Sequence, residues 1–179
     1  MIINPNIVAK DPTSIHFNID IAALPTELLG RIFELNASMD EDLARLRQQS
    51  VAFTTLLSSS LVCQLWRQIV LNAPALWGRV VNLDRLRWVY REWWDELLRR
   101  TGNATLHVKA HTIRKTDSPE FAFLKRILED HWDRIQVLEI EVPYPIMEHL
   151  IPAFQHPTTS LVVFHGEIIA PLGLLNSNG

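Results

Sequence analysis

The sequence predicts an α+β fold, with a helical front part and a back part in which strands and helices alternate. Two short and strongly apolar helical segments lie at residues 24–33 and 61–70. Beyond Trp77 the period of the apolar residues changes, and alternating segments typical of half-buried strands appear at residues 105–110 and 135–142. With 179 residues, of which 47% are hydrophobic, the chain fits one domain or a small module joined to a second unit.

Composition and charge narrow the classes of protein to which the chain can belong. A net charge of −3 gives no general attraction to nucleic acid or to anionic membranes. The single cysteine excludes an intrachain disulfide framework and favours a reducing compartment, so we expect a cytoplasmic or nuclear protein. The first residues do not form a signal peptide, and the apolar stretch 161–175 is too short and too polar to cross a bilayer.

The two front helices carry more apolar surface than one core requires. At about 100° per residue, the apolar positions of each helix spread over roughly half of its circumference. They are Leu24, Leu28, Leu29, Ile32, Phe33 and Leu35 in the first helix, and Leu61, Val62, Cys63, Leu65, Trp66, Ile69 and Val70 in the second. Packing against a single core needs a stripe of only about 100° or slightly more. The excess predicts a second buried face, and a partner protein is the natural candidate to cover it.

These segments resemble the F-box motif, most closely that of the F-box-like proteins abundant in fungi. The resemblance rests on the sequences LPTELLGRIF at residues 24–33, VCQLWRQI at 62–69 and PALW at 74–77. It implies a three-helix module that docks on the Skp-type adaptor of an SCF (Skp–cullin–F-box) ubiquitin ligase. The adaptor-binding residues implied by the resemblance are Leu24, Pro25, Leu28, Leu29, Ile32, Phe33, Val62, Cys63, Trp66 and Ile69. Taken by itself, Cys63 on this apolar helix is expected to be a small buried hydrophobe.

The gap between Phe33 and Val62 is longer than in a compact F-box by about one helix and a loop. Ser38 and Glu41 have the spacing of a capping box, so we expect a short inserted helix running towards Gln49. Its charged surface is either solvated or a contact for a regulator or partner. We expect a partly disordered lead-in at residues 1–20, an F-box-like domain at 21–78 and an α/β region at 79–179.

The back part is predicted to contain strand–helix units. We expect a short strand at residues 80–83 and a helix at 86–100, which buries Leu86, Val89, Tyr90, Trp93, Trp94 and Leu97. Gly102 would end this helix. A strand at 105–110 follows, then a helix that begins at Ser118 and Pro119, a strand at 135–142, a short helix or turn at 145–154 and a strand at 160–164.

Two of these strands resemble leucine-rich repeats. The segment from Ile135 to Ile140 has the L-x-x-L-x-L form, and Leu161-x-Val163 is a weaker copy roughly 22 residues later. F-box proteins often carry such repeats after the box. Because arrays generally need about three units or more, we expect a shortened solenoid, either a truncated gene product or a fragment.

The sequence contains no recognisable catalytic or metal-binding pattern. His107 and His111 are four residues apart, but they flank a predicted strand and have no adjacent carboxylate or cysteine. No nucleophile elbow, phosphate loop or dinucleotide fingerprint is present. The aromatic and arginine-rich segment 85–100 could stack on nucleotides, but its helical spacing and balanced charge favour core packing. We therefore expect no enzyme activity, no cofactor and no bound metal.

The resemblance implies a non-catalytic F-box subunit that binds a Skp-type adaptor and, through it, a cullin. Its back part would present a protein substrate whose identity the sequence does not indicate. The alternative is an interaction or scaffold protein whose helices form a closed core with no link to a ligase. An enzyme is the third hypothesis, and it would require a site that the sequence does not contain.

Overall fold

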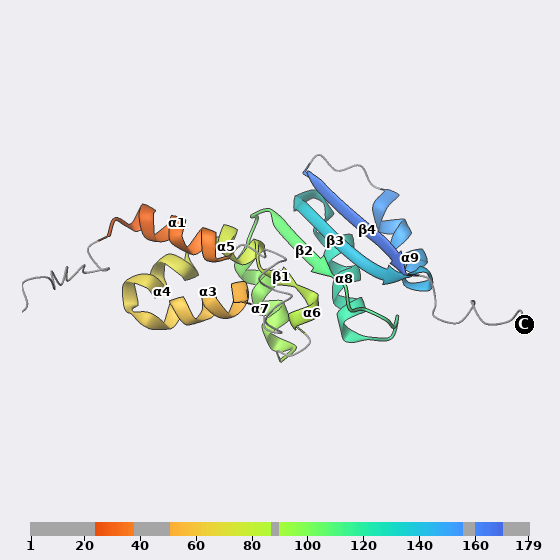
Figure 1. Cartoon of the computed structure of the whole chain (residues 1–179), viewed down its shortest axis with the longest axis horizontal. Helices are drawn as coiled ribbons and strands as arrows, with labels where there is room; N and C mark the ends of the chain where they lie inside the picture. The colour runs from red at the N-terminus through yellow and green to blue at the C-terminus, as the bar shows by residue number, and fades with distance from the viewer. Residues whose placement is uncertain (1–23, 38–50, 87–89, 156–159, 170–179) are drawn as a thin grey trace, which may run out of the picture.

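The structure is a computed structural model that describes residues 24–37, 51–86, 90–155 and 160–169. Helices occupy one end of an elongated molecule and a parallel sheet occupies the other (Figure 1). One continuous hydrophobic core runs from Leu29 in the first helix to Leu150 in the last. None of the helices in these ranges is long and apolar enough to cross a membrane.

The helical end consists of α1 (Thr26–Asn36), α3 (Val51–Val62), α4 (Gln64–Leu71) and α5 (Pro74–Gly78). Pro25 precedes α1, and its carbonyl accepts hydrogen bonds from the backbone N–H groups of Leu28 and Leu29. The Phe33 ring meets the Trp66 ring edge to face, with centroids 5.1 Å apart, which joins α1 to α4. The Trp77 indole N–H donates to the carbonyl of Val70 at 2.9 Å and ties α5 to the end of α4.

The predicted helix at 61–70 is two helices, and this part of the prediction was wrong. Cys63 adopts an extended conformation with φ −155° between α3 and α4, which ends one helix and begins the next. The hydroxyl-rich residues 54–60, which precede the predicted helix, belong to α3 itself. Cys63 is exposed, not buried, because it lies in the turn between the helices. The predicted helix from Ser38 towards Gln49 and the lead-in at 1–20 lie outside the described residues.

The sheet contains β1 (Val81–Asn82), β2 (Leu106–Ala110), β3 (Ile135–Pro143) and β4 (Val163–Ile169), paired in that order and all parallel. The connections contain α6 (Leu83–Leu86), α7 (Glu92–Thr101), α8 (Pro119–Asp130) and α9 (Tyr144–Leu150). Single turns, Trp132–Arg134 and Ile151–Gln155, precede β3 and follow α9. Leu138 and Ile140 of β3 lie in the core, as the alternating pattern predicts.

Several predicted boundaries are confirmed. Ser118 caps α8 by accepting a hydrogen bond from the Phe121 N–H at 3.1 Å. Gly102 ends α7 with a positive φ of 48°, a conformation that glycine adopts readily. Within α7, Glu96 and Arg100 form an ion pair at 2.7 Å, four residues apart on the helix.

Two predictions in the back part were wrong. The helix expected at 86–100 is present only from Glu92 onward, as α7, whereas Leu86 is the last residue of α6 and Val89 lies outside the described residues. The apolar stripe drawn for one continuous helix does not hold, because Tyr90 and Trp93 are exposed, whereas Trp94 and Leu97 are buried. The last strand begins at Val163 and not at residue 160, and β3 pairs Leu138 with Phe164. The residue beside Leu138 is therefore Phe164, 26 positions later, and not a member of the predicted copy Leu161-x-Val163, which was expected roughly 22 residues later.

Candidate functional site

The outer face of α1 presents large apolar side chains to solvent. Leu28, Ile32 and Leu35 are 52%, 40% and 63% exposed. Their spacing of four and three residues places them in one stripe of the helix. A second stripe, about 100° further round the helix, is buried, since Leu29 and Phe33 retain almost no exposed surface. The sequence prediction of two apolar faces on this helix is thus confirmed in the structure.

A second exposed apolar group lies where α3 meets α4. Leu61 and Val62 end α3 and are both exposed, and the exposed Cys63 follows them. We call the stripe on α1 and this turn together the apolar helical surface; its members are Leu28, Ile32, Leu35, Leu61 and Val62. Both parts belong to the helical end of the molecule (Figure 1). Exposed apolar patches of this kind mark interaction sites more often than isolated surface leucines do.

The residues that the F-box resemblance assigned to adaptor binding occupy three kinds of position. Pro25, Leu28, Ile32, Val62 and Cys63 are exposed. Leu24, Trp66 and Ile69 are half-buried and pack against the core. Leu29 and Phe33 lie inside the core, so their side chains are not accessible to a partner in this conformation.

Sequence reasoning left Leu35 and Leu61 out of the assigned set, although both were counted among the apolar positions of the helices. The signal for Leu35 was its position seven residues after Leu28, which continues the same stripe. No comparable signal existed for Leu61, because its exposure depends on the break at Cys63.

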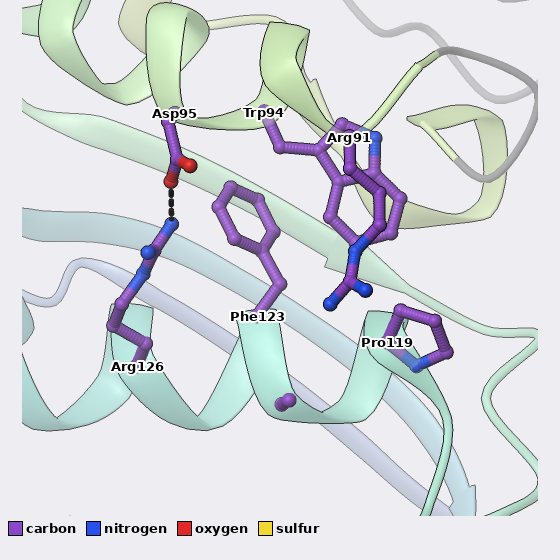
Figure 2. A pocket seen from close by; sticks show the side chains of 7 residues that line it. Arg91, Trp94, Asp95, Pro119, Phe123 and Arg126 are labelled. Atoms are coloured by element: carbon purple, nitrogen blue, oxygen red, sulfur yellow. Dashed lines mark hydrogen bonds and ion pairs between the residues drawn. The ribbon is translucent and has the colours of Figure 1, made fainter.

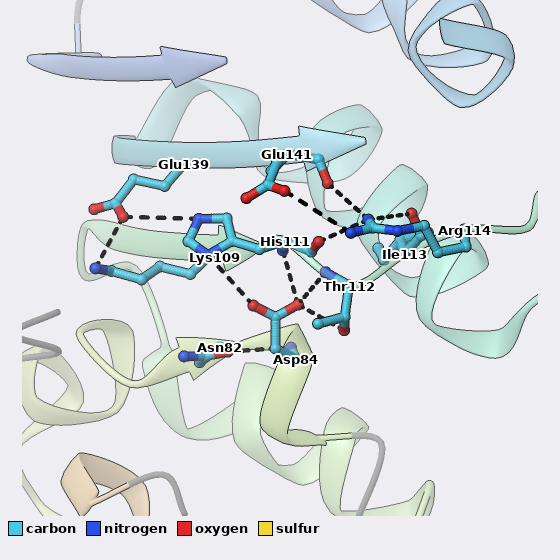
Figure 3. A network of polar contacts seen from close by, with 9 residues as sticks. All are labelled: Asn82, Asp84, Lys109, His111, Thr112, Ile113, Arg114, Glu139 and Glu141. Atoms are coloured by element: carbon cyan, nitrogen blue, oxygen red, sulfur yellow. Dashed lines mark hydrogen bonds and ion pairs between the residues drawn. The ribbon is translucent and has the colours of Figure 1, made fainter. Parts of the chain in front are cut away.

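The face of the sheet opposite the core is polar. Lys109 of β2 and Glu139 of β3 form an ion pair at 2.9 Å that is almost completely enclosed (Figure 3). Asp84 accepts hydrogen bonds from the backbone N–H groups of His111 and Thr112, both at 2.7 Å, and thereby fixes the end of β2 against α6. Burial lowers the pKa of His107, on the same face of β2 as Lys109. Glu139 Oε2 accepts no hydrogen bond of standard geometry among the described residues, and its ion pair with Lys109 holds it in place. These contacts account for the polar face as structure.

A cavity of about 340 Å³ lies between α7 and α8 (Figure 2). Trp94 and Phe123 line it with aromatic surface, and the Arg126 guanidinium lies 5.0 Å from the centre of the Phe123 ring and pairs with Asp95. Its charged lining is Arg91, Asp95 and Arg126, with no cysteine, serine or histidine among the lining residues. The cavity thus offers two guanidinium groups, one carboxylate and two aromatic rings.

The front of the chain is therefore a small helical module with a closed core and an exposed apolar stripe. Residues 21–82 match the family model of the F-box-like domain, and the chain contains such a domain at these residues. The F-box resemblance of the sequence is thereby confirmed for this segment. Neither a comparison with curated proteins nor one with solved structures finds a match.

Proposed function

We propose that this protein is a non-catalytic F-box subunit of an SCF-type ubiquitin ligase, which docks on a Skp-type adaptor through the apolar helical surface. The family match at residues 21–82 supports an adaptor-binding role. The observation that carries the proposal is the stripe of Leu28, Ile32 and Leu35, which the core of the molecule leaves exposed. Through the adaptor, the subunit would join a cullin.

The size of the exposed stripe suits a protein interface. A fully buried leucine or isoleucine side chain contributes roughly 1.5–3 kcal/mol relative to an exposed one. Covering the exposed half of several such side chains would contribute several kcal/mol before the costs of association are subtracted. The rigid core on the other side of α1 holds the stripe in place, so little ordering is needed when a partner binds.

The back part would hold the protein substrate near the transferred ubiquitin. We propose that it is the start of a leucine-rich-repeat-like solenoid. Parallel strands with intervening helices support this, as do the separations of paired residues, which are 27 for Val81 and Val108, 30 for Val108 and Leu138, and 26 for Leu138 and Phe164. The first and last of these lie within the range of about 20–29 residues for such repeats, and the middle one is slightly longer. We propose on the same basis that the protein acts in the cytoplasm, the nucleus or both, on a protein substrate.

The test is co-expression of residues 1–179 with a Skp-type adaptor, followed by size-exclusion chromatography. We expect co-elution at a 1:1 ratio, and we expect Leu28→Asp combined with Ile32→Asp to abolish it, because two carboxylates would be buried without partners. The control is Tyr144→Asp, which alters an exposed aromatic residue on α9 and leaves co-elution intact.

Two results would contradict the proposal in different ways. Binding that survives the double substitution would show that the adaptor uses another surface. A folded wild-type chain that never co-elutes with the adaptor would favour the alternative, a helical interaction protein without a link to a ligase.

A further inference from the structure

Strand β4 is an edge strand of the sheet formed by the described residues. Among the described residues it pairs with β3 alone, and it stands last in the strand order. Phe164 and Ile168 are each 53% exposed, although both lie on the apolar side of the sheet. Every second residue of an edge strand directs its N–H and C=O groups away from its neighbour, and these groups are a template for another strand.

Two copies of β4, paired antiparallel and centred on Gly166, would place complementary residues opposite each other. The strand reads Val163, Phe164, His165, Gly166, Glu167, Ile168, Ile169. If a second copy of this strand runs antiparallel with Gly166 opposite Gly166, then His165 lies opposite Glu167 and Phe164 lies opposite Ile168. Residues placed opposite each other in this register always point to the same face of the sheet, because their numbers are both odd or both even.

We propose that β4 pairs with β4 of a second copy of this chain, antiparallel about a two-fold axis at Gly166. Such an interface is isologous, with the same residues contributed by each copy. The two parallel sheets would then join into one continuous sheet. Each dimer would contain two His165–Glu167 pairs and two Phe164–Ile168 pairs. This inference is independent of the proposed docking on an adaptor.

The charges within one copy favour this occupant. Glu167 lies directly across from Glu141 of β3, whose carboxylate pairs with Arg114 at 3.8 Å, so the residue opposite Glu167 is an acid and not a base. A second copy would bring His165 to the other side of Glu167, where an imidazole can donate a hydrogen bond to the carboxylate. Each copy would thus supply His165 as a hydrogen-bond donor to Glu167 of the other copy, a donor that β3 does not place opposite Glu167.

The ring of Phe164 lies close to Gly166, the residue at the proposed two-fold axis, and favours glycine there. A Cβ atom at residue 166 would lie 2.8 Å from Cζ of Phe164, so the ring covers the place where a side chain would stand. At the axis, the two glycines leave room for the Phe164 rings of both copies. A larger residue at this position would push these rings off the apolar face.

Sedimentation equilibrium of the full chain tests the proposal. We expect a reversible dimer at concentrations on the order of 10–100 µM, as suits a small interface. Glu167→Lys places a lysine opposite His165 twice per dimer, and we expect it to raise the dimer dissociation constant about tenfold. Combining it with His165→Glu exchanges the two charges and should restore the wild-type constant.

The control is Glu148→Lys, which makes the same change of charge at an exposed position of α9 and should leave the dimer unchanged. Circular dichroism checks that each variant is folded. A chain that stays monomeric at about 200 µM would overturn the proposal, whether the edge is then open or covered by another segment. A dimer that Glu167→Lys does not weaken, or that the exchanged pair does not restore, would also overturn it, and would assign association to another surface such as the apolar helical surface.

Discussion

Gly78 lies where the helical end of the molecule meets the sheet, and it shows how closely the two parts approach. A Cβ atom at this position would stand 2.2 Å from the backbone carbonyl oxygen of Thr105, just before β2. A backbone oxygen cannot rotate away as a flexible side chain can. The absence of a side chain at Gly78 therefore permits α5 to pack against the start of β2.

We expect Gly78→Ala to lower the free energy of unfolding by about 1–3 kcal/mol, the usual cost of overpacking a buried site. Chemical denaturation measures this change. Gly30→Ala is the matched control, because nothing lies within 4 Å of a Cβ atom there. In the middle of α1, alanine should stabilise the helix by up to about 1 kcal/mol. Equal effects of the two substitutions would contradict the close contact at Gly78.

His107 makes the stability of the fold depend on pH. Burial is the main cause that lowers its pKa below the ordinary value of 6.5. As the pH falls below about 6.5, the unfolded chain takes up this proton before the folded one does, so the free energy of unfolding decreases. Above about pH 6.5 His107 does not reduce the free energy of unfolding. Below it, the reduction grows as the pH falls, until the pH reaches the pKa of His107 in the folded state. His131, whose pKa burial also lowers, acts in the same direction.

We expect His107→Gln to reduce the loss of stability between about pH 7.5 and pH 5.5, measured by urea denaturation at several pH values. Carboxylates titrate mainly below this range and so contribute little to the difference. An unchanged slope in the variant would exclude His107 as a source of the pH dependence.

At the scale of elements, local signals fixed the helices and strands wherever a capping residue or an alternating pattern was present. Ser118 and Pro119 marked the start of α8, Gly102 marked the end of α7, and alternation marked β3. The break at Cys63 has no such signal, since neither glycine nor proline occurs there. The helices on either side, α3 and α4, both contact α1 and each other, so we attribute the break to tertiary packing.

Ser118→Ala should lower the free energy of unfolding by about 0.5–2 kcal/mol, because it leaves the Phe121 N–H at the start of α8 without its side-chain acceptor. Thermal or chemical denaturation measures the loss. Ser58→Ala, at an exposed position within α3, is the control and should stay within about 0.5 kcal/mol of the wild type. A Ser118 variant as stable as that control would show that the cap contributes nothing.

At the scale of the whole molecule, the helical module and the sheet share one core. Trp77 of the module lies under the Arg100 guanidinium of α7, 4.8 Å from the ring centre, and α5 contacts both α7 and β2. The buried residues form one cluster that crosses the expected domain boundary at residue 78. The two parts are therefore coupled by packing and not only by a linker.

We expect the described core to unfold in one cooperative transition, with equal calorimetric and van't Hoff enthalpies in a scanning calorimeter. Binding of a Skp-type adaptor at about 100 times its dissociation constant should add about 2.7 kcal/mol to the stability of the whole chain. Two separate transitions, of which only one responds to the adaptor, would show that the module and the sheet unfold independently.

The sequence by itself determined the helical module, the apolar excess on α1 and the strand–helix character of the back part. These depend on the spacing of apolar residues along one helix or strand, and local spacing is fully present in the sequence. Only the tertiary structure decided which apolar residues are accessible. Leu28 and Leu29 are adjacent leucines on one helix, but α3 and α4 cover only Leu29. The structure likewise set the register of β4, because strand pairing joins residues that the chain holds far apart.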